Sequence, residues 1–238
     1  MKPTYTLSMP PPKGEIKRRA DRTGYETPLG CLPSITTVVG ATKSEAAKRA
    51  LQAWLDRPGG EERSLAARTR GTYLHTQAEN WINGLPTQHH LVFGGYWRSL
   101  QRWLETNFHS ALGVELPCYR PAPWGVGGFS GTFDCLGWTY DSTELCLIDW
   151  KTSQRYRDPN SEMMRGGYYI QLAAYRAAIA FTYGIEVNQA LLVIARQIGK
   201  PDVYHLDRDL LDECEAEFFE RLHRYQEAHF KEALHVVA

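Results

Sequence analysis

The sequence has no excess of charge of either sign and no long apolar run. Its 238 residues contain 27 Lys and Arg against 27 Asp and Glu, which excludes the overall basic field of proteins that coat nucleic acid. No apolar run approaches the ~18 residues that a membrane span needs. Residues 1–20 contain no continuous apolar segment of the signal-peptide kind. We therefore expect no membrane association and a cytoplasmic location.

The cysteines also lack a pattern. Five are scattered along the chain, and no two of them form a Cys-x-x-Cys pair. This excludes the common zinc-site spacings and a disulfide framework, so we expect the cysteines to be reduced and mostly buried. The chain further lacks internal repeats, low-complexity tracts and a flexible interdomain linker.

What is present is a composition that can bury a core. Hydrophobic residues make up 43% of the chain and aromatic residues 12%, which favours one globular domain. Five prolines in residues 1–32 predict a poorly ordered or wrapping N-terminal arm. We assign 33–238 to a single domain, with a helical layer at 33–112, a catalytic core at 113–206 and a C-terminal helix at 207–238.

Hydrophobic periodicity predicts helices first and strands later, in the order ααα-βββ-α-ββ-α. Residues 34–39 are rich in β-branched side chains, whereas Ser44 begins a clear helical pattern. In the second predicted helix, Leu65, Leu74 and Trp81 contribute to an apolar stripe. The predicted helices span 44–55, 61–81, 91–108, 161–183 and 210–233, and the predicted strands span 114–119, 127–138, 145–150, 190–195 and 203–206.

Two carboxylates and a lysine lie at the ends of neighbouring predicted strands, where they are candidates for a metal-dependent active site. Asp149 and Lys151 are two residues apart in a strand, so both should face one cleft with Asp134, while Trp150 packs away. Carboxylates are the ligands that Mg²⁺ prefers, and the Trp150 backbone carbonyl is a further candidate ligand. Such a set can hydrolyse a phosphodiester with a metal ion. Asp-x-Lys alone is common by chance, so the inference depends on the whole set.

Four motifs follow one another in the chain. They are Gly71-Thr72-Tyr73-Leu74-His75, Gly131-Thr132-Phe133-Asp134, Ile148-Asp149-Trp150-Lys151-Thr152 and Gln171-Leu172-Ala173-Ala174-Tyr175. Over roughly residues 33–195, the chain resembles the PD-(D/E)XK nuclease superfamily. Within it, the chain is similar to the RecB-type exonucleases, which include CRISPR-adaptation and mitochondrial genome-maintenance exonucleases. This resemblance implies an α/β (α+β) fold with a restriction-endonuclease-like core: a central mixed sheet in αβββαβ order, with an N-terminal helical layer over the cleft.

The resemblance also implies a metal site. It makes Asp134 and Asp149 the acidic ligands and His75 an additional ligand from the upstream helix. Imidazole suits Mn²⁺ better than Mg²⁺, so we expect Mg²⁺ with Mn²⁺ as a substitute. Glu79 lies one helical turn from His75, where it either orients the imidazole or has a solvated or N-terminal-dipole role. Glu115 begins the first predicted strand and is a further candidate ligand.

The remaining roles also come from the resemblance. Lys151 would be the catalytic lysine, and Gln171 and Tyr175 would contact the DNA backbone or order the site. Phe133 stands where the superfamily's name has proline, a departure that the RecB-type group tolerates. Iron–sulfur members of the group carry a cysteine cluster near the C-terminus, where this chain has only Cys214. We therefore expect no iron–sulfur cluster.

Several cations and tyrosines flank these motifs and are candidates for binding DNA. The alternative is that the arginines form a solvated face and the tyrosines belong to the core. The candidates for DNA contact are Arg70, Arg155, Arg157, Arg165 and Tyr168, with Tyr156 and Tyr169 as further stacking faces.

Three functions remain open. The first is a Mg²⁺-dependent DNA exonuclease acting on single-stranded ends in repair, recombination or phage replication, encoded by a bacterium or phage. The second is a structure-selective endonuclease or nickase with the same site. The third is an inert DNA-binding or partner-binding module, which the complete set of motif residues disfavours. No Gly-x-x-x-x-Gly-Lys-Ser/Thr loop is present, so unwinding would need a replication or recombination partner.

Overall fold

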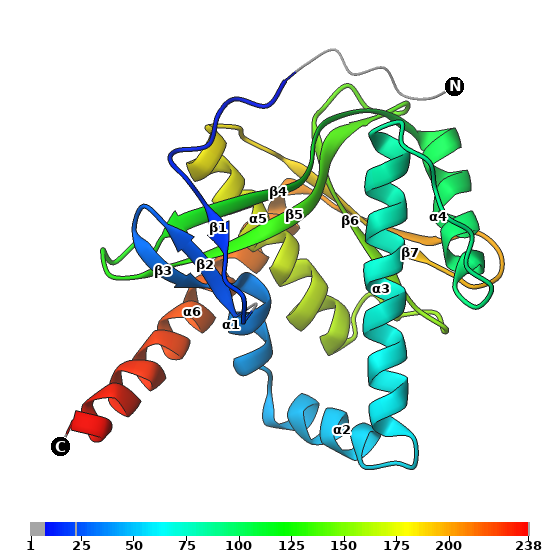
Figure 1. The fold of residues 1–238 in the computed structure, drawn as a ribbon. Helices are drawn as coiled ribbons and strands as arrows, with labels where there is room; N and C mark the ends of the chain where they lie inside the picture. The colour runs from blue at the N-terminus through cyan, green and yellow to red at the C-terminus, as the bar shows by residue number, and fades with distance from the viewer. Residues whose placement is uncertain (1–7, 22, 238) are drawn as a thin grey trace.

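The computed structural model describes residues 8–21 and 23–237, with the backbone alone for 230–237, and its centre is a five-stranded sheet of order β4-β5-β6-β7-β8 (Figure 1). Strands β6 and β7 pair parallel, and the other neighbours pair antiparallel. The mixed central sheet confirms the predicted fold class. Its strands are β4 (Phe108–Pro121), β5 (Gly128–Thr139), β6 (Cys146–Thr152), β7 (Gln189–Ala195) and β8 (Asp202–Leu206).

Helices cover both faces of this sheet. Alternate residues of β7 point into two different cores, as the period of a strand requires: Leu192 lies in a core with α1, α5 and α6, and Val193 lies in a core with α3 and α4. None of the helices in the described part of the chain has both the length and the apolar character of a membrane-spanning segment. The helices are α1 (Ile35–Ala41), α2 (Glu45–Leu55), α3 (Gly60–Ile82), α4 (Gly94–Asn107), the π-helix η1 (Met164–Tyr169), α5 (Ile170–Tyr183) and α6 (Arg208–Val237).

The N-terminal segment is more regular than the predicted poorly ordered or wrapping arm. It forms a three-stranded antiparallel sheet of β1 (Lys17–Arg18), β2 (Gly24–Thr27) and β3 (Gly30–Pro33). The prolines at positions 10–12 and 28 lie outside its strands, and Tyr25 and Leu32 are buried. The poorly ordered alternative is therefore wrong for residues 17–18, 24–27 and 30–32, which form strands. Burial of Tyr25 and Leu32 stabilises these strands, and local sequence does not indicate this burial. The part of the arm in residues 1–7 lies outside the described residues, and the division at residue 33 stays a prediction.

Helix α1 forms from the β-branched run that follows. Ser34 caps it by accepting a hydrogen bond from the Thr37 amide at 3.1 Å. Ile35, Val38 and Val39 are buried against α5 and α6. This burial outweighs the weak helix propensity of β-branched side chains.

Only the C-terminal half of α3 packs on the sheet. Leu74 and Trp81 are buried, whereas Leu65 is 60% exposed, so the predicted apolar stripe is wrong in the first half of the helix. Helix α2 contains no buried residue. Figure 1 shows α2 and the beginning of α3 extending beyond the central sheet. These two helices therefore project past the domain body.

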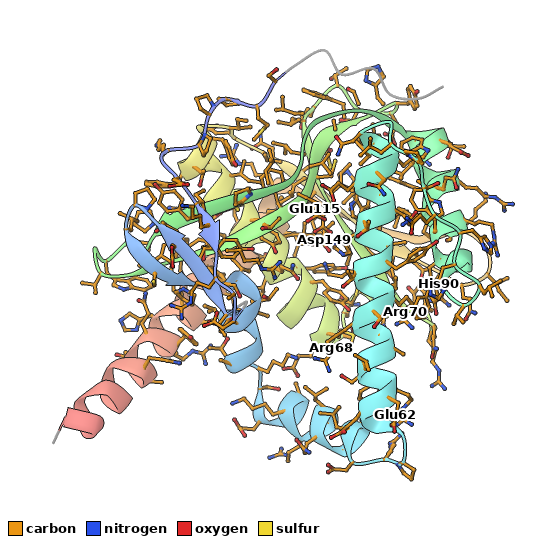
Figure 2. The ribbon with its side chains drawn as sticks, viewed as in Figure 1. Glu62, Arg68, Arg70, His90, Glu115 and Asp149 are labelled. Atoms are coloured by element: carbon orange, nitrogen blue, oxygen red, sulfur yellow. The ribbon has the colours of Figure 1, made fainter. Side chains whose placement is uncertain are left out.

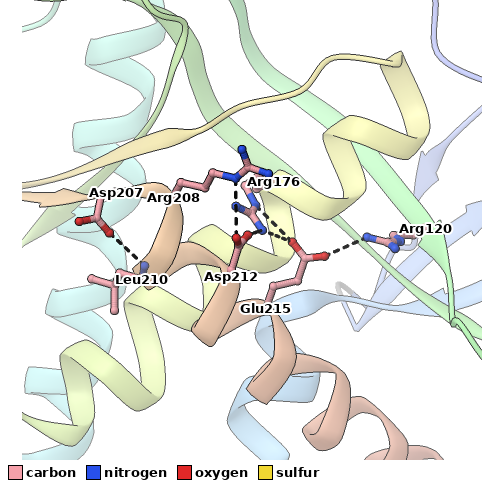
Figure 3. A network of polar contacts seen from close by, with 7 residues as sticks. All are labelled: Arg120, Arg176, Asp207, Arg208, Leu210, Asp212 and Glu215. Atoms are coloured by element: carbon pink, nitrogen blue, oxygen red, sulfur yellow. Dashed lines mark hydrogen bonds and ion pairs between the residues drawn. The ribbon is translucent and has the colours of Figure 1, made fainter.

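The predicted helix 161–183 is in fact the π-helix η1 followed by α5. The long helix α6 then packs against α5 and is held there by charged side chains. Arg176 on α5 contacts Asp212 at 2.6 Å and Glu215 at 2.7 Å, and Glu215 also contacts Arg120 of β4 at 3.2 Å (Figure 3). The C-terminal helix is thereby tied to the elements beside the central sheet.

Candidate metal centre and active site

Asp134 and Asp149 meet where β5 and β6 stop pairing. Cys135 pairs with Ile148 at the end of this ladder, and the two aspartates occupy the next position. Both are buried, with 5% and 2% exposure. Asp134 Oδ2 accepts a hydrogen bond from the Trp150 amide at 2.7 Å. The strands thus bring two carboxylates together with little access to water.

Lys151 lies on the same strand face as Asp149 and forms an ion pair with it. Trp150 between them is fully buried in the core under α3 and α4, which confirms that it packs away from this face. Burial raises the pKa of Asp149 to about 6, although the Lys151 charge opposes this rise. Burial disfavours the charged form of Lys151, but Asp149 and Asp134 outweigh it and raise its pKa above the usual range.

His75 and Glu115 approach Asp134 from different elements. His75 Nδ1 on α3 lies 3.1 Å from Glu115 Oε1 on β4 and 3.4 Å from Asp134 Oδ1. Burial disfavours the imidazolium, yet Asp134 and Glu115 raise the His75 pKa to about 10. The pKa of Glu115 is raised, mainly by burial and by the charge of Asp134. The negative charge of Glu79 adds a smaller rise. Orientation of His75 by Glu79 stays a prediction.

The backbone of Glu115 is left-handed, with φ 48°. L residues with a Cβ seldom adopt this region. At this point of β4, Glu115 Oε1 lies 3.1 Å from His75 Nδ1. Figure 2 shows Glu115 and Asp149 in the space beside α3. An unusual backbone therefore supports the site residue that the sequence indicated least strongly.

Gln171 and Tyr175 lie one turn apart on α5, and Gln171 Nε2 donates to the Tyr175 hydroxyl at 3.2 Å. The Tyr175 ring lies directly against Gly131 of β5. A Cβ at Gly131 would lie 2.6 Å from Tyr175 Cε1, so this motif position needs glycine for the close approach. The Gln and Tyr motif is thus packed against the strand that carries Asp134.

The predicted DNA contacts divide into two groups. Arg70 Nε donates to Thr152 Oγ1 at 2.9 Å, and its guanidinium lies 4.8 Å from the Tyr96 ring centre. The Tyr168 ring lies 5.6 Å from Lys151 Nζ. Both are therefore next to the Asp149–Thr152 segment.

The other predicted contacts lie on the loop and helix that follow. Arg155 and Arg165 are exposed, and Arg157 Nε donates to Ser153 Oγ at 3.0 Å. Tyr156 is 64% exposed, whereas Tyr169 is only 4% exposed. Tyr169 belongs to the core and is not a stacking face, so that expectation is corrected.

Sequence reasoning missed the residues that connect the site to more distant elements. Thr152 was only part of a motif, and Tyr25 was assigned to an irregular arm. The Tyr25 hydroxyl lies 2.7 Å from Thr132 Oγ1 of the second motif. Arg221 of α6 donates to the Gly166 carbonyl in η1 at 2.8 Å. No local pattern marks these contacts, because each joins segments far apart in the sequence.

The donor set fits a hard divalent cation. The ligand atoms of His75, Glu115 and Asp134 all lie within 4.8 Å of one another. Both carboxylate oxygens of Asp149 are buried without a hydrogen-bond partner among the described residues, and the Lys151 ion pair offsets part of this burial. Buried, unbonded oxygens are costly unless a cation joins them. The arrangement can therefore hold a metal ion, whose identity it does not specify.

The profile of the PD-(D/E)XK nuclease superfamily matches residues 38–235, so the chain belongs to that superfamily. This confirms the resemblance drawn from the motifs. Mitochondrial genome maintenance exonuclease 1 of Xenopus tropicalis is 27% identical over 194 residues, which cover 76% of this chain and 53% of the relative. The chain spans about half the length of that relative.

Solved structures also match, at lower sequence identity. A protein of Eubacterium rectale, provisionally described as an exonuclease, matches with a TM-score of 0.47 and 14% identity, over 66% of this chain and 65% of that one. Family membership supports a nuclease function, and nucleases of this superfamily use divalent metals.

Proposed function

We propose that the protein is a metal-dependent DNA exonuclease that acts on the ends of single-stranded DNA in repair, recombination or phage replication. The observation that carries this proposal is the convergence of His75, Glu115 and Asp134 beside the buried Asp149–Lys151 pair. We assign His75, Asp134, Asp149 and Glu115 as side-chain ligands, with the Trp150 carbonyl as a backbone ligand. Mg²⁺ is the proposed ion, Mn²⁺ would substitute for it, and no iron–sulfur cluster is involved.

A bound divalent cation would supply positive charge against the scissile phosphate and lower the pKa of the attacking water. Lys151 stays protonated beside Asp149, so in the proposed reaction it stabilises negative charge on the phosphate rather than acting as a base. Gln171 and Tyr175 would position the strand, and Arg70, Arg155, Arg157, Arg165 and Tyr168 would contact its backbone or bases.

The preference for single strands is supported by the projecting helices. The exposed first half of α3 and the unburied α2 leave a helical layer that stands off the sheet (Figure 1). Such a layer resembles an arch that admits a flexible single strand and excludes a rigid duplex. A strand that threads through such an arch enters by a free end, so cleavage would depend on DNA ends. A replication or recombination partner would provide any unwinding.

The test is degradation of end-labelled single-stranded, double-stranded and circular DNA with Mg²⁺, Mn²⁺ or EDTA. We expect metal-dependent loss of linear single strands, abolished by Asp149→Ala and by Lys151→Ala. Arg224→Gln, an exposed change on α6, is the matched control and should retain activity. Cleavage of circular DNA would favour an endonuclease over an exonuclease. DNA binding without cleavage in the presence of either metal would contradict the proposed activity.

A further inference from the structure

The N-terminal sheet lies on the same side of the central sheet as α3. Figure 1 shows β1–β3 and α3 in front of the central strands, with α5 behind them. Glu115 is labelled between these two elements in Figure 2. Both β2 and β3 contact β5, the strand that carries Asp134. The candidate site is therefore flanked by α3 on one side and by the N-terminal sheet on the other.

Tyr25 connects this sheet to the site. Its ring is 3% exposed, and its hydroxyl lies 2.7 Å from Thr132 Oγ1. Thr132 precedes Asp134 by two residues, which places both on one face of an extended strand. Burial raises the pKa of Tyr25, and the charge of Glu115 adds to the rise. Tyr25 thus contacts the strand that carries Asp134, at a residue on the same strand face as that candidate ligand.

Arg18 lies over Tyr25 on the outer strand of the sheet. The two residues face each other across the β1–β2 ladder, and the Arg18 guanidinium lies 5.9 Å from the ring centre. Its neighbours are neutralised: Lys17 contacts Glu15 at 3.0 Å, and Arg19 contacts Asp21 at 2.8 Å. Within residues 8–21 and 23–229, Arg18 has no carboxylate partner. It is an exposed cation that an aromatic ring already orients.

We propose that the N-terminal sheet is a second wall of the substrate-binding face, and that Arg18 binds a backbone phosphate of the DNA strand a few nucleotides from the scissile bond. This rests on the proposed nuclease function. A guanidinium held on a rigid strand loses little freedom on binding phosphate, and each such contact adds to affinity independently of sequence. The alternative is that Arg18 only shields the Tyr25 ring from water.

The experiment compares Arg18→Gln with Lys17→Gln, the adjacent residue on the same strand, whose charge is already paired. Binding of fluorescein-labelled oligothymidine is measured by fluorescence anisotropy in EDTA, so that cleavage does not interfere, and again with Ca²⁺. We expect Arg18→Gln to weaken binding about 5–10-fold and to reduce the slope of log affinity against log salt by about 0.7, the value for one single-strand phosphate contact. Lys17→Gln should change the affinity by less than about twofold.

A second readout uses strand length. The effect of Arg18→Gln should disappear with oligonucleotides too short to reach from the metal site to β1, and with cleaved substrates it should raise KM while leaving kcat unchanged. Thermal unfolding checks that both variants fold, and Arg18→Lys should recover part of the affinity.

The outcomes separate the two proposals. Equal effects of Arg18→Gln and Lys17→Gln, or no binding by the wild type in either condition, would overturn the role of Arg18. If the wild type cleaves no DNA but Arg18→Gln still weakens binding, the proposed exonuclease activity is wrong and the proposed role of Arg18 in binding is supported. If Asp149→Ala abolishes cleavage and Arg18→Gln leaves the affinity unchanged, the nuclease activity is supported and the role of Arg18 is wrong.

Discussion

Glu115 combines two unfavourable features in one residue. Its backbone is left-handed, which costs an L residue about 1–2 kcal/mol, and its carboxylate is partly buried beside Asp134. Strain of this kind persists where the surrounding structure enforces it, and it concentrates at functional sites. The strain at Glu115 is therefore consistent with the proposed role in binding metal.

Replacing Glu115 should trade metal affinity for stability. Glu115→Gly removes the strained Cβ and the repulsion with Asp134, so the free energy of unfolding of the metal-free protein should rise by about 1 kcal/mol. Loss of a ligand should weaken Mn²⁺ binding by at least about tenfold. Urea denaturation in EDTA gives the first quantity, and Mn²⁺ titration followed by electron paramagnetic resonance gives the second.

Glu115→Gln is the matched control, because it removes the charge and keeps the left-handed backbone. It should lose a similar amount of Mn²⁺ affinity with a smaller gain in stability. A Gly variant that is less stable than the wild type, or that binds Mn²⁺ unchanged, would show that Glu115 serves the fold instead of the metal.

At the residue scale, the motif residues could be predicted from the sequence, because their types and their order in the chain indicate a metal-dependent nuclease site. Asp134, Asp149 and Lys151 do converge, since strand periodicity determines which residues share a face. The backbone of Glu115 was not predictable, because nothing in Val-Glu-Leu signals a positive φ. Tyr25 and Arg18 were missed for a related reason: their contacts depend on where an N-terminal sheet packs.

At the scale of elements, η1 is the segment that places Tyr168 above Lys151. Arg221 of α6 is 7% exposed, contacts Glu217 and donates to the Gly166 carbonyl at 2.8 Å. A Cβ at Gly166 would lie 3.2 Å from Arg221 Nη2, so the glycine leaves room for the guanidinium. π-Helical turns recur at functional sites, and here a remote arginine stabilises one.

Removing this support should weaken the contribution of Tyr168, which is a proposed DNA contact beside Lys151. Arg221→Gln frees the Gly166 carbonyl, and we expect kcat/KM on single-stranded DNA to fall about tenfold, or ~1.4 kcal/mol. Tyr168→Ala should produce a similar fall in kcat/KM, and the double variant should be no worse than either. Faster hydrogen exchange of the 164–171 amides in Arg221→Gln would report the loosened π-helix directly.

Arg224→Gln is the control, because Arg224 is exposed on the next part of the same helix. Multiplicative effects of Arg221→Gln and Tyr168→Ala on kcat/KM would mean that the arginine does not act through Tyr168.

Elements differ in how far local sequence determines them. The predicted bounds of β7 differ from the observed ones by one residue. A short, continuous apolar run is typical of a strand that is buried on both faces, as β7 is. Helix α1 and the π-helix were not predicted. The first forms from β-branched residues because Ile35 and Val38 find a core, and the second needs Arg221 from a helix late in the chain.

On the scale of the whole molecule, the charged contacts in Figure 3 hold α6 against α5 and β4. Arg176 is the centre of this set, with a side chain only 13% exposed and two carboxylate partners. Without Arg176, Glu215 would keep only its contact with Arg120, and a partly buried carboxylate that loses a cationic partner is destabilised. The set therefore contributes to stability in a way that isolated surface pairs do not.

Arg176→Met should lower the free energy of unfolding by about 2–3 kcal/mol, somewhat less than for a fully buried pair because water still reaches Asp212. Arg208→Gln is the control. Its guanidinium is exposed and lies 3.8 Å from Asp212, so the change should stay within about 0.5 kcal/mol. Urea denaturation of both variants measures the difference, and equal losses would argue against a central role for Arg176.

The position of β6 in the sheet determines how much of the chain must be synthesised before the candidate site can assemble. Asp149 and Lys151 lie on a strand between β5 and β7, and the parallel partner β7 lies beyond α5 in the chain. A ribosome must therefore release Ala195 before β6 gains its second neighbour, and α6 must follow before Arg221 reaches η1. Parallel pairing of distant segments is slow and late in folding. A nascent chain would thus carry all of its acidic motif residues for some time without an assembled centre.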